Sequence, residues 1–119
     1  MKTLKHKDKK IIEENALAFS TIDQTKKPYV VGAACCKVVE NKIIITDNFM
    51  KSTVKNIKNN SNVAIVAWDK DWNGCQILGK AKYYDSGKWL NFIKSIKENK
   101  DMPAKGAIVV SINKIIKSK

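Results

Sequence analysis

The residues best suited to chemistry lie between two apolar runs, in the stretch DNFMKSTVKNIKNN at positions 47–60. Lys51, Ser52 and Thr53 supply one ammonium group and two hydroxyl groups where an expected strand leads into an expected helix. The first N–H groups of a helix lack partners within the helix and carry partial positive charge. Together these donors can bind one phosphate dianion. The alternative is structural: Ser52 or Thr53 caps the helix, and Lys51 is solvated.

The elements that must position this cluster follow from hydrophobic periodicity. Apolar residues at helical spacing predict helices over residues 8–17, 52–60 and 86–100, with Asp8 and Ser86 as candidate N-caps. Runs rich in β-branched residues predict strands over residues 17–23, 29–39, 43–46, 62–68, 75–84 and 107–116, with a hairpin over 29–46. Sequential strands joined by tight turns predict an antiparallel sheet, and this many in one small domain indicate a barrel. The fold class is therefore mainly β with short helices.

Composition indicates a single domain and limits where the protein can act. The chain has 119 residues, 44% of them hydrophobic, which suits one globular core. No apolar run approaches the roughly 20 residues of a membrane span. The basic N-terminus contains acidic residues and no uninterrupted apolar segment, so a signal peptide is not expected and a cytoplasmic location is the default expectation.

The net charge of +12 raises a nucleic-acid function as an alternative. All 23 basic residues are lysines, however, and arginine is the preferred residue for bidentate recognition of bases and phosphates. The abundance of Lys, Asn and Ile also suggests an A/T-rich coding bias. A small basic β-barrel that binds single-stranded nucleic acid would need aromatic residues on one face. The candidates are scattered along the sequence: Tyr29, Phe49, Tyr83 and Tyr84.

The three cysteines do not form a disulfide or metal framework in the sequence. Cys35 and Cys36 are adjacent, and Cys75 stands alone. In a strand, neighbouring side chains point to opposite faces, which argues against a disulfide between these two adjacent cysteines. The odd count and the absence of framework spacing argue against a disulfide scaffold. One histidine and no CxxC motif argue against a structural zinc site, and no metal is expected.

The stretch KIIITDNFMKSTVKNIKNNSNVAIVAW resembles FMN-binding split-barrel proteins related to pyridoxamine 5′-phosphate oxidase. Members show a strand, a polar turn, a Lys/Ser/Thr cluster, an Asn-Leu/Ile pair and an Asn-Pro-x-Val motif before the next strand. This chain has Asn56-Ile57 and then Asn60-Ser61-Asn62-Val63, with serine in place of proline. The segments CQILGKAKYY and MPAKGAIVVSINKI also resemble family strands. The resemblance covers roughly residues 12 to 116.

The resemblance implies an antiparallel, Greek-key-like split β-barrel with peripheral helices, formed by residues 1–119 as one domain. It implies non-covalent FMN at a homodimer interface, with the phosphate held by Lys51, Ser52 and Thr53. The ribityl chain and the flavin edge would lie along Thr46, Asp47 and Asn48. The strand beside the isoalloxazine ring would be formed by Val31, Gly32, Ala33, Ala34 and Cys35. The second chain would contribute the far wall of the pocket, for which Trp68, Trp72 and Gln76 are candidates; plain core or interface packing is the favoured alternative for the two tryptophans.

The departures from the family pattern limit the expected activity. Vitamin B6 oxidases carry basic residues for the substrate phosphate and an arginine-containing tail, whereas this chain has no arginine and only Lys37 near one such position. Vitamin B6 oxidase activity is therefore not expected. No catalytic residue stands out, so a redox role with a small-molecule partner is expected, with a deazaflavin or haem as the alternative cofactor. Cys35 and Cys36 are either small apolar strand residues or, for one of them, a flavin contact.

Overall fold

The computed structural model describes residues 2–118 and shows a β-rich chain with short helices. The helices are α1 (His6–Glu14), α2 (Ser52–Asn59) and α3 (Lys88–Ser95), and a 3₁₀ turn, η1 (Lys97–Asn99), follows α3. The strands are β1 (Leu17–Ile22), β2 (Pro28–Ala33), β3 (Lys37–Val39), β4 (Lys42–Asp47), β5 (Asn62–Trp68), β6 (Gly74–Tyr84) and β7 (Gly106–Ser118). Among these helices, none is long and apolar enough to cross a membrane.

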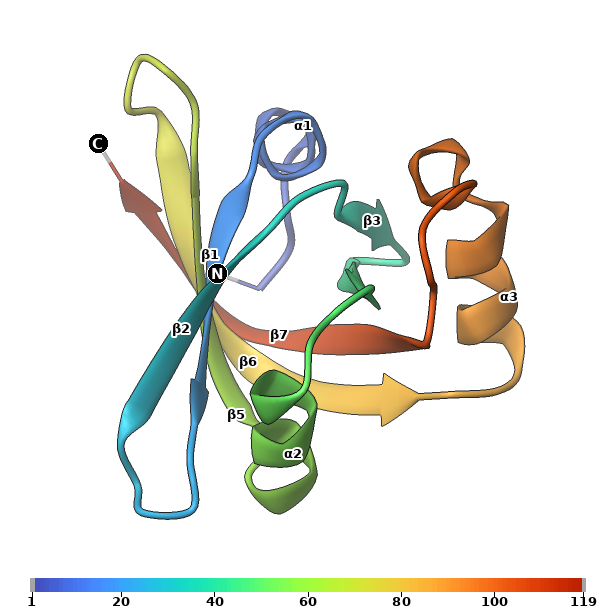
Figure 1. Ribbon diagram of the computed structural model, residues 1–119. Helices are drawn as coiled ribbons and strands as arrows, with labels where there is room; N and C mark the ends of the chain where they lie inside the picture. The colour runs from blue at the N-terminus through green and yellow to red at the C-terminus, as the bar shows by residue number, and fades with distance from the viewer. Residues whose placement is uncertain (1, 119) are drawn as a thin grey trace.

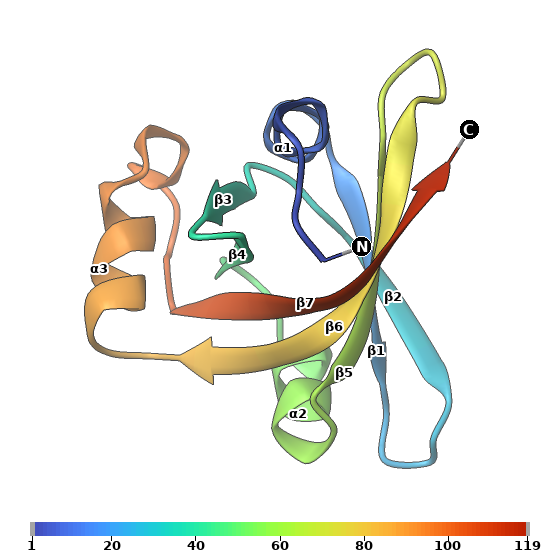
Figure 2. The same cartoon turned by 180° about the vertical axis from the view of Figure 1, so that it is seen from behind.

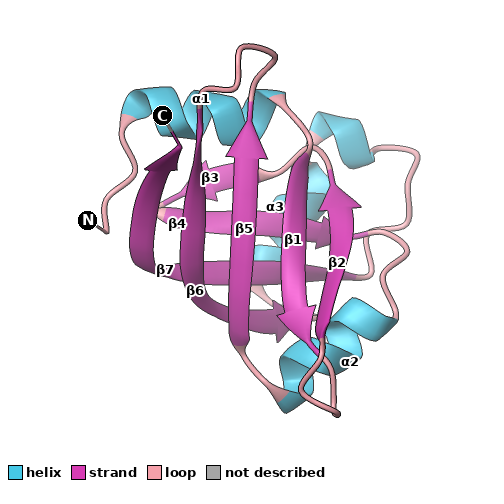
Figure 3. Ribbon diagram, turned by 90° about the vertical axis from the view of Figure 1, so that its left-hand side faces the viewer, coloured by secondary structure: helices cyan, strands magenta, loops and turns pink. Residues whose placement is uncertain are grey.

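The strands form one antiparallel sheet in the order β2-β1-β5-β6-β7-β4-β3. The sheet curls on itself, because β6 and β7 are long and belong to both halves of the barrel (Figures 1 and 2). Seen from the side, β4 runs across β1 and β5 behind them (Figure 3). This arrangement confirms the antiparallel split barrel with peripheral helices. α2 lies below the barrel in this view, and α1 lies above it.

The barrel interior is filled by alternating residues of the strands. In β1, Leu17 and Phe19 are buried, whereas Ala18 between them is more exposed. The same alternation in β5 and β6 buries Ile65 and Ile77. A second, smaller cluster lies outside the barrel, where α3 packs Trp89 against β4 and β7. The chain therefore has one main core and a satellite core beneath α3.

One predicted strand is wrong, and the predicted hairpin is wrong with it. The run expected as a single strand over 29–39 is broken into β2 and β3, and Cys35 between them has a φ of +59°. β2 pairs with β1, whereas β3 pairs with β4, so the hairpin contains only β3 and β4. Both halves of the run have strand-forming composition, so the sequence did not show that the chain changes direction at this point.

The expected helix caps also differ from those in the structure. α3 begins after Gly87, which has a φ of +85°, and Ser86 does not cap it. The helix predicted to reach residue 100 ends at Ser95 and continues as the short 3₁₀ turn. Asp8 lies inside α1 rather than at its N-cap, but its carboxylate still accepts the backbone N–H of Lys5 at 3.2 Å. A carboxylate in the first turn satisfies an N–H that the helix leaves open.

Candidate functional site

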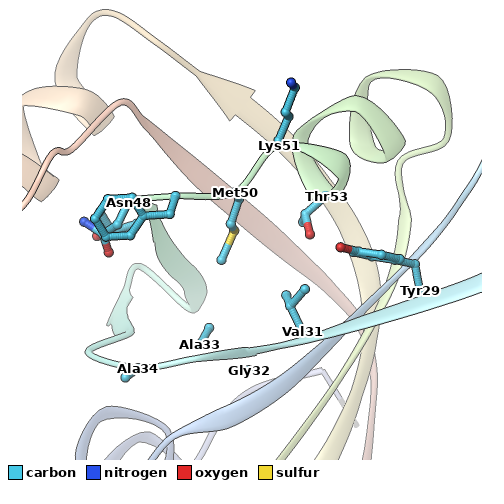
Figure 4. Close-up of a pocket in the computed structure, with 11 residues that line it drawn as sticks. Tyr29, Val31, Gly32, Ala33, Ala34, Asn48, Met50, Lys51 and Thr53 are labelled. Atoms are coloured by element: carbon cyan, nitrogen blue, oxygen red, sulfur yellow. The ribbon is translucent and has the colours of Figure 1, made fainter.

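A pocket of about 320 Å³ lies between β2 and the chain segment that joins β4 to α2 (Figure 4). Residues of β2 and its extension, Val31, Gly32, Ala33 and Ala34, line one side of it. The other side is lined by Thr46, Asn48, Phe49, Met50, Lys51 and Thr53. Tyr29, at the start of β2, also lines the pocket and points its hydroxyl towards Thr53. The structure thus gathers eight of the twelve predicted cofactor-binding residues around one cavity.

The β2 side of the pocket is formed by small side chains in a regular strand. Gly32 pairs with Ala18 without a shift in register, so the glycine does not mark a bulge. A Cβ atom added at Gly32 would meet nothing within 4 Å in the chain. Nothing inside the described chain therefore requires glycine at this position. A close approach by something outside the chain stays a prediction.

The opposite side is the first turn of α2, which presents the predicted phosphate donors. Lys51 is the N-cap residue, and no side chain caps the helix, so the alternative of a capping Ser52 or Thr53 is wrong. Thr53 is 1% exposed and points its hydroxyl into the pocket. The Lys51 side chain extends away from β2 at the pocket rim (Figure 4). Ser52 instead faces a neighbouring hollow that Tyr29 and Lys55 also line.

Two buried residues on the inner face of α2 hold it in place. Asn56 and Ile57 are 5% and 4% exposed. The Asn56 amide nitrogen donates a hydrogen bond of 3.0 Å to the hydroxyl of Thr21 in β1. Because Thr21 is itself buried, this bond satisfies polar groups that would otherwise be costly to bury. Asn56 and Ile57 therefore fix the helix that forms one side of the pocket.

A hydrogen-bond network closes the far end of the pocket. The Asn99 amide nitrogen donates to the Thr46 hydroxyl at 2.9 Å and to the Ile93 carbonyl at 2.9 Å. The Asn48 amide nitrogen donates to the Pro103 carbonyl at 2.8 Å. Thr46 and Asn48, the expected ribityl contacts, are thus oriented by residues that follow α3 in the chain. Asn99 is more than fifty residues away in sequence, and no local pattern marks it.

Asp47 lies beside the pocket but does not line it, whereas the other two expected ribityl contacts, Thr46 and Asn48, do. Its carboxylate is 1% exposed and accepts hydrogen bonds from the Met50 backbone N–H at 2.8 Å and the Tyr83 hydroxyl at 2.7 Å. The Lys105 ammonium lies 3.8 Å from it. Burial is the main cause that raises the pKa of Tyr83, and the hydrogen bond to Asp47 is the second cause. The hydroxyl therefore stays protonated and donates. Asp47 therefore shapes the turn rather than facing the cavity.

Three further expected site residues lie elsewhere in the single chain. Gln76 is exposed between the buried Cys75 and Ile77, so it points away from the barrel interior. Trp68 and Trp72 stack with ring centroids 6.4 Å apart at the turn between β5 and β6. The structure does not bring these residues to the pocket of the same chain.

The cysteines beside the pocket have different environments. Cys35 follows the pocket-lining Ala34 but does not line the cavity itself. Cys36 is fully buried, and burial raises the pKa of its thiol to about 12. A thiol with such a pKa is a poor nucleophile at neutral pH, which suits a small apolar core residue. Burial likewise raises the pKa of Cys75 to about 11.

Sequence reasoning missed three pocket-lining residues: Tyr29, Phe49 and Met50. Tyr29 had a usable signal, because it lies two residues before Val31 and four before Ala33. In a strand these three side chains share one face. Phe49 and Met50 lie in an irregular turn, where no periodicity predicts direction.

The family model for pyridoxamine 5′-phosphate oxidase matches residues 4–119 of the sequence. The chain belongs to this family. A relative from Methanocaldococcus jannaschii, a protein without a characterised function, is 30% identical over 111 residues, which are 89% of this chain and 74% of the relative. The family assignment agrees with the motifs around Lys51.

Solved structures share the fold of this family member at low sequence identity. HupZ of Group A Streptococcus has a TM-score of 0.87 at 18% identity and covers 97% of this chain and 94% of its own. An FMN-binding protein from Syntrophomonas wolfei has a TM-score of 0.77 at 18% identity, covering 95% and 84%. A structure named F420 reductase has a TM-score of 0.75 at 16% identity, covering 94% and 98%. At these identities the likeness shows the split-barrel fold.

Proposed function

We propose that the protein binds FMN non-covalently in the pocket between β2 and α2 and serves as a flavin-dependent redox protein. The observation that carries this proposal is a strand of small side chains facing a helix N-terminus across one cavity. Its volume of about 320 Å³ lies at the lower end of the usual range for ligand pockets, roughly 300–1,000 Å³. A flat ring fits beside β2, and an anion fits at α2.

The residues present suit the three parts of FMN. Lys51, Thr53 and the open N–H groups of the first turn of α2 would hold the phosphate. Thr46 and Asn48 would contact the ribityl chain, held in place by the hydrogen bonds from Asn99 and to Pro103. When bound, the flavin supplies hydride or electron transfer, and the protein supplies binding, orientation and electrostatics.

A second copy of the chain would complete the site in this proposal. The outer face of the sheet exposes apolar side chains, including Val30 at 64%, Trp68 at 37% and Ile116 at 38%. The same face contains Gly32, where the described chain leaves open space. A homodimer packed there would cover apolar surface and bring residues such as Gln76 towards the partner's pocket. Multi-angle light scattering should give twice the chain mass, and a monomer at all accessible concentrations would contradict the dimer.

A ligand titration tests the cofactor assignment. Purified protein, stripped of ligand, should quench the fluorescence of added FMN at a stoichiometry of one per chain. Riboflavin should bind more weakly, because it lacks the phosphate that Lys51 and Thr53 would hold. Indifference to FMN, or equal affinity for both flavins, would overturn this assignment of the site.

Three alternative ligands form further arms of the same test. A deazaflavin is the second candidate cofactor, since an F420 reductase has the same fold. Tighter binding of F420 than of FMN would favour a deazaflavin. An absorption spectrum typical of haem would favour haem. Single-stranded nucleic acid has less support. The ammonium groups of Lys58 and Lys82 lie 5.1 Å and 5.5 Å from the ring centres of Tyr83 and Tyr84, so these rings do not form one open stacking face. Oligonucleotide binding with a steep salt dependence and no flavin binding would reverse this order.

A further inference from the structure

Asp47 is a buried carboxylate whose hydrogen bonds link distant parts of the chain. It ends β4, and only 1% of its surface is exposed. One oxygen accepts the Met50 backbone N–H at 2.8 Å, and the other accepts the Tyr83 hydroxyl at 2.7 Å. A buried carboxylate is costly unless donors satisfy it. These donors fix Asp47, and through it the start of the turn that leads to Lys51.

The turn is held from a second side at Met50. The Lys105 ammonium lies 3.4 Å from the Met50 carbonyl oxygen and 3.8 Å from the Asp47 carboxylate. The Lys105 backbone N–H also donates to the Asp47 carbonyl at 3.0 Å. Met50 is therefore held at its N–H by Asp47 and at its carbonyl by Lys105. The next residue in the chain is Lys51, the N-cap of α2.

Tyr83 reaches this turn because the neighbouring strand makes room for its ring. A Cβ atom added at Gly106 in β7 would lie 2.3 Å from the Tyr83 hydroxyl oxygen and ring carbon Cζ. That separation is far too short for non-bonded atoms, so the glycine permits this ring position. The Lys58 ammonium of α2 lies 5.1 Å from the centre of the same ring, within range of a cation–π contact. Tyr83 thus contacts both the turn and the helix that together form the phosphate side of the pocket.

We infer that Tyr83 and Lys105, acting through Asp47 and Met50, position the turn that presents Lys51 and the first N–H groups of α2 to the cofactor phosphate. This inference rests on the proposed FMN function. Tyr83 is a positioning residue: it does not line the pocket but determines where the phosphate donors lie. Donors fixed before the ligand arrives bind more tightly than mobile ones, because less conformational freedom is lost on binding.

The test compares Tyr83→Phe with wild-type protein for both FMN and riboflavin. Loss of one hydrogen bond to the carboxylate should weaken FMN binding roughly three- to tenfold and leave riboflavin within about twofold. Tyr84→Phe is the matched control, because Tyr84 is adjacent in β6 but packs in the cluster under α3. This control should bind both flavins as the wild type does.

A double variant distinguishes a positioning role of Tyr83 from an effect on FMN binding that is independent of Lys51. If Tyr83 acts through Lys51, then Lys51→Ala combined with Tyr83→Phe should weaken FMN binding less than the product of the two single effects. Independent effects that multiply fully would overturn the inference. So would an equal loss for FMN and riboflavin in Tyr83→Phe, or wild-type FMN affinity in that variant.

Two further measurements keep the test decisive. Wild-type protein that fails to bind FMN would refute the proposed function itself, and this result does not depend on any variant. If Tyr83→Phe does not fold, Lys105→Gln replaces it, because Lys105 is exposed and its removal spares the core. Lys105→Gln should weaken FMN binding roughly two- to fivefold. Lys100→Gln, which removes an exposed charge from the same segment, should have no effect; equal behaviour of the two lysine variants would overturn the inference.

Discussion

The two junctions at which a strand leads into a helix, β4 to α2 and β6 to α3, have similar ingredients but different surroundings. Both contain an acidic residue, a serine and a lysine within a few positions of the helix start. At the first junction, Asp47 is buried and fixes the turn, and the helix N-terminus faces the pocket. At the second, Gly87 begins the helix with a φ of +85°, and α3 packs Trp89 onto a satellite core.

The difference shows that a Lys/Ser cluster at a helix start becomes a candidate anion site through what lies opposite it. α2 faces β2 and its extension, where Gly32, Ala33 and Ala34 are small and leave space for a ligand. α3 faces Ile44 and Val109, which fill the space between helix and sheet. α2 therefore forms part of the pocket, whereas α3 contributes to stability by packing on the satellite core.

The largest expected effect is on stability at the second junction. Trp89→Ala removes a large buried side chain from the satellite core, and we expect the free energy of unfolding to fall by about 3–5 kcal/mol. FMN affinity, measured by titration well below the unfolding transition, should stay unchanged because α3 does not line the pocket. A parallel loss of FMN affinity in folded protein would show that both junctions shape the site.

The next effect is on binding at the first junction. Lys51→Ala removes a cation from the pocket rim, and we expect FMN binding to weaken by roughly 1.5–3 kcal/mol if the lysine makes a charge-assisted hydrogen bond to phosphate. Riboflavin binding should change much less. Lys88→Ala is the matched control in the first turn of α3, where the lysine forms an exposed ion pair with Glu40 at 3.8 Å and lies 4.8 Å from the centre of the Trp89 ring. Similar losses in both variants would assign the effect to net charge instead of the site.

The smallest effect compares the two glycines of these regions. Gly32→Ala should raise the free energy of unfolding of the isolated chain by about 0.4–1 kcal/mol, because the new Cβ meets nothing within 4 Å and the unfolded chain loses freedom. Because position 32 lies on the outer face with Val30, the added Cβ should also weaken the proposed homodimer, which would pack on that face. Denaturant unfolding and multi-angle light scattering measure the two effects.

Gly87→Ala provides the control for backbone conformation. Gly87 has a φ of +85°, which L-residues rarely adopt, so the substitution should destabilise the chain and leave FMN binding unchanged. If Gly32→Ala formed the homodimer as readily as wild type, a close approach of the second chain to β2 at this position would be wrong.

Much of the fold could be predicted because its signals are local. Runs rich in β-branched residues predicted β1, β5 and β6, and the helical spacing of apolar residues predicted α2, in which Ile57 is buried. The pairing of strands is not local. The run over 29–39 was predicted as one strand. In the structure it divides at Cys35, because its first half pairs with β1 and its second half pairs with β4.

The sequence by itself determined that this protein has alternating strands, an amphipathic helix after residue 51, and phosphate-binding residue types at its start. The tertiary structure decided which of them face a common cavity. It turned Asp47 inward to Tyr83, 36 residues away, and brought Asn99 to Thr46, 53 residues away. It also left Gln76 on the outer face. The physical reason is that residue type and periodicity act over a few positions, whereas direction in a turn and contact across a sheet depend on the packing of the whole chain.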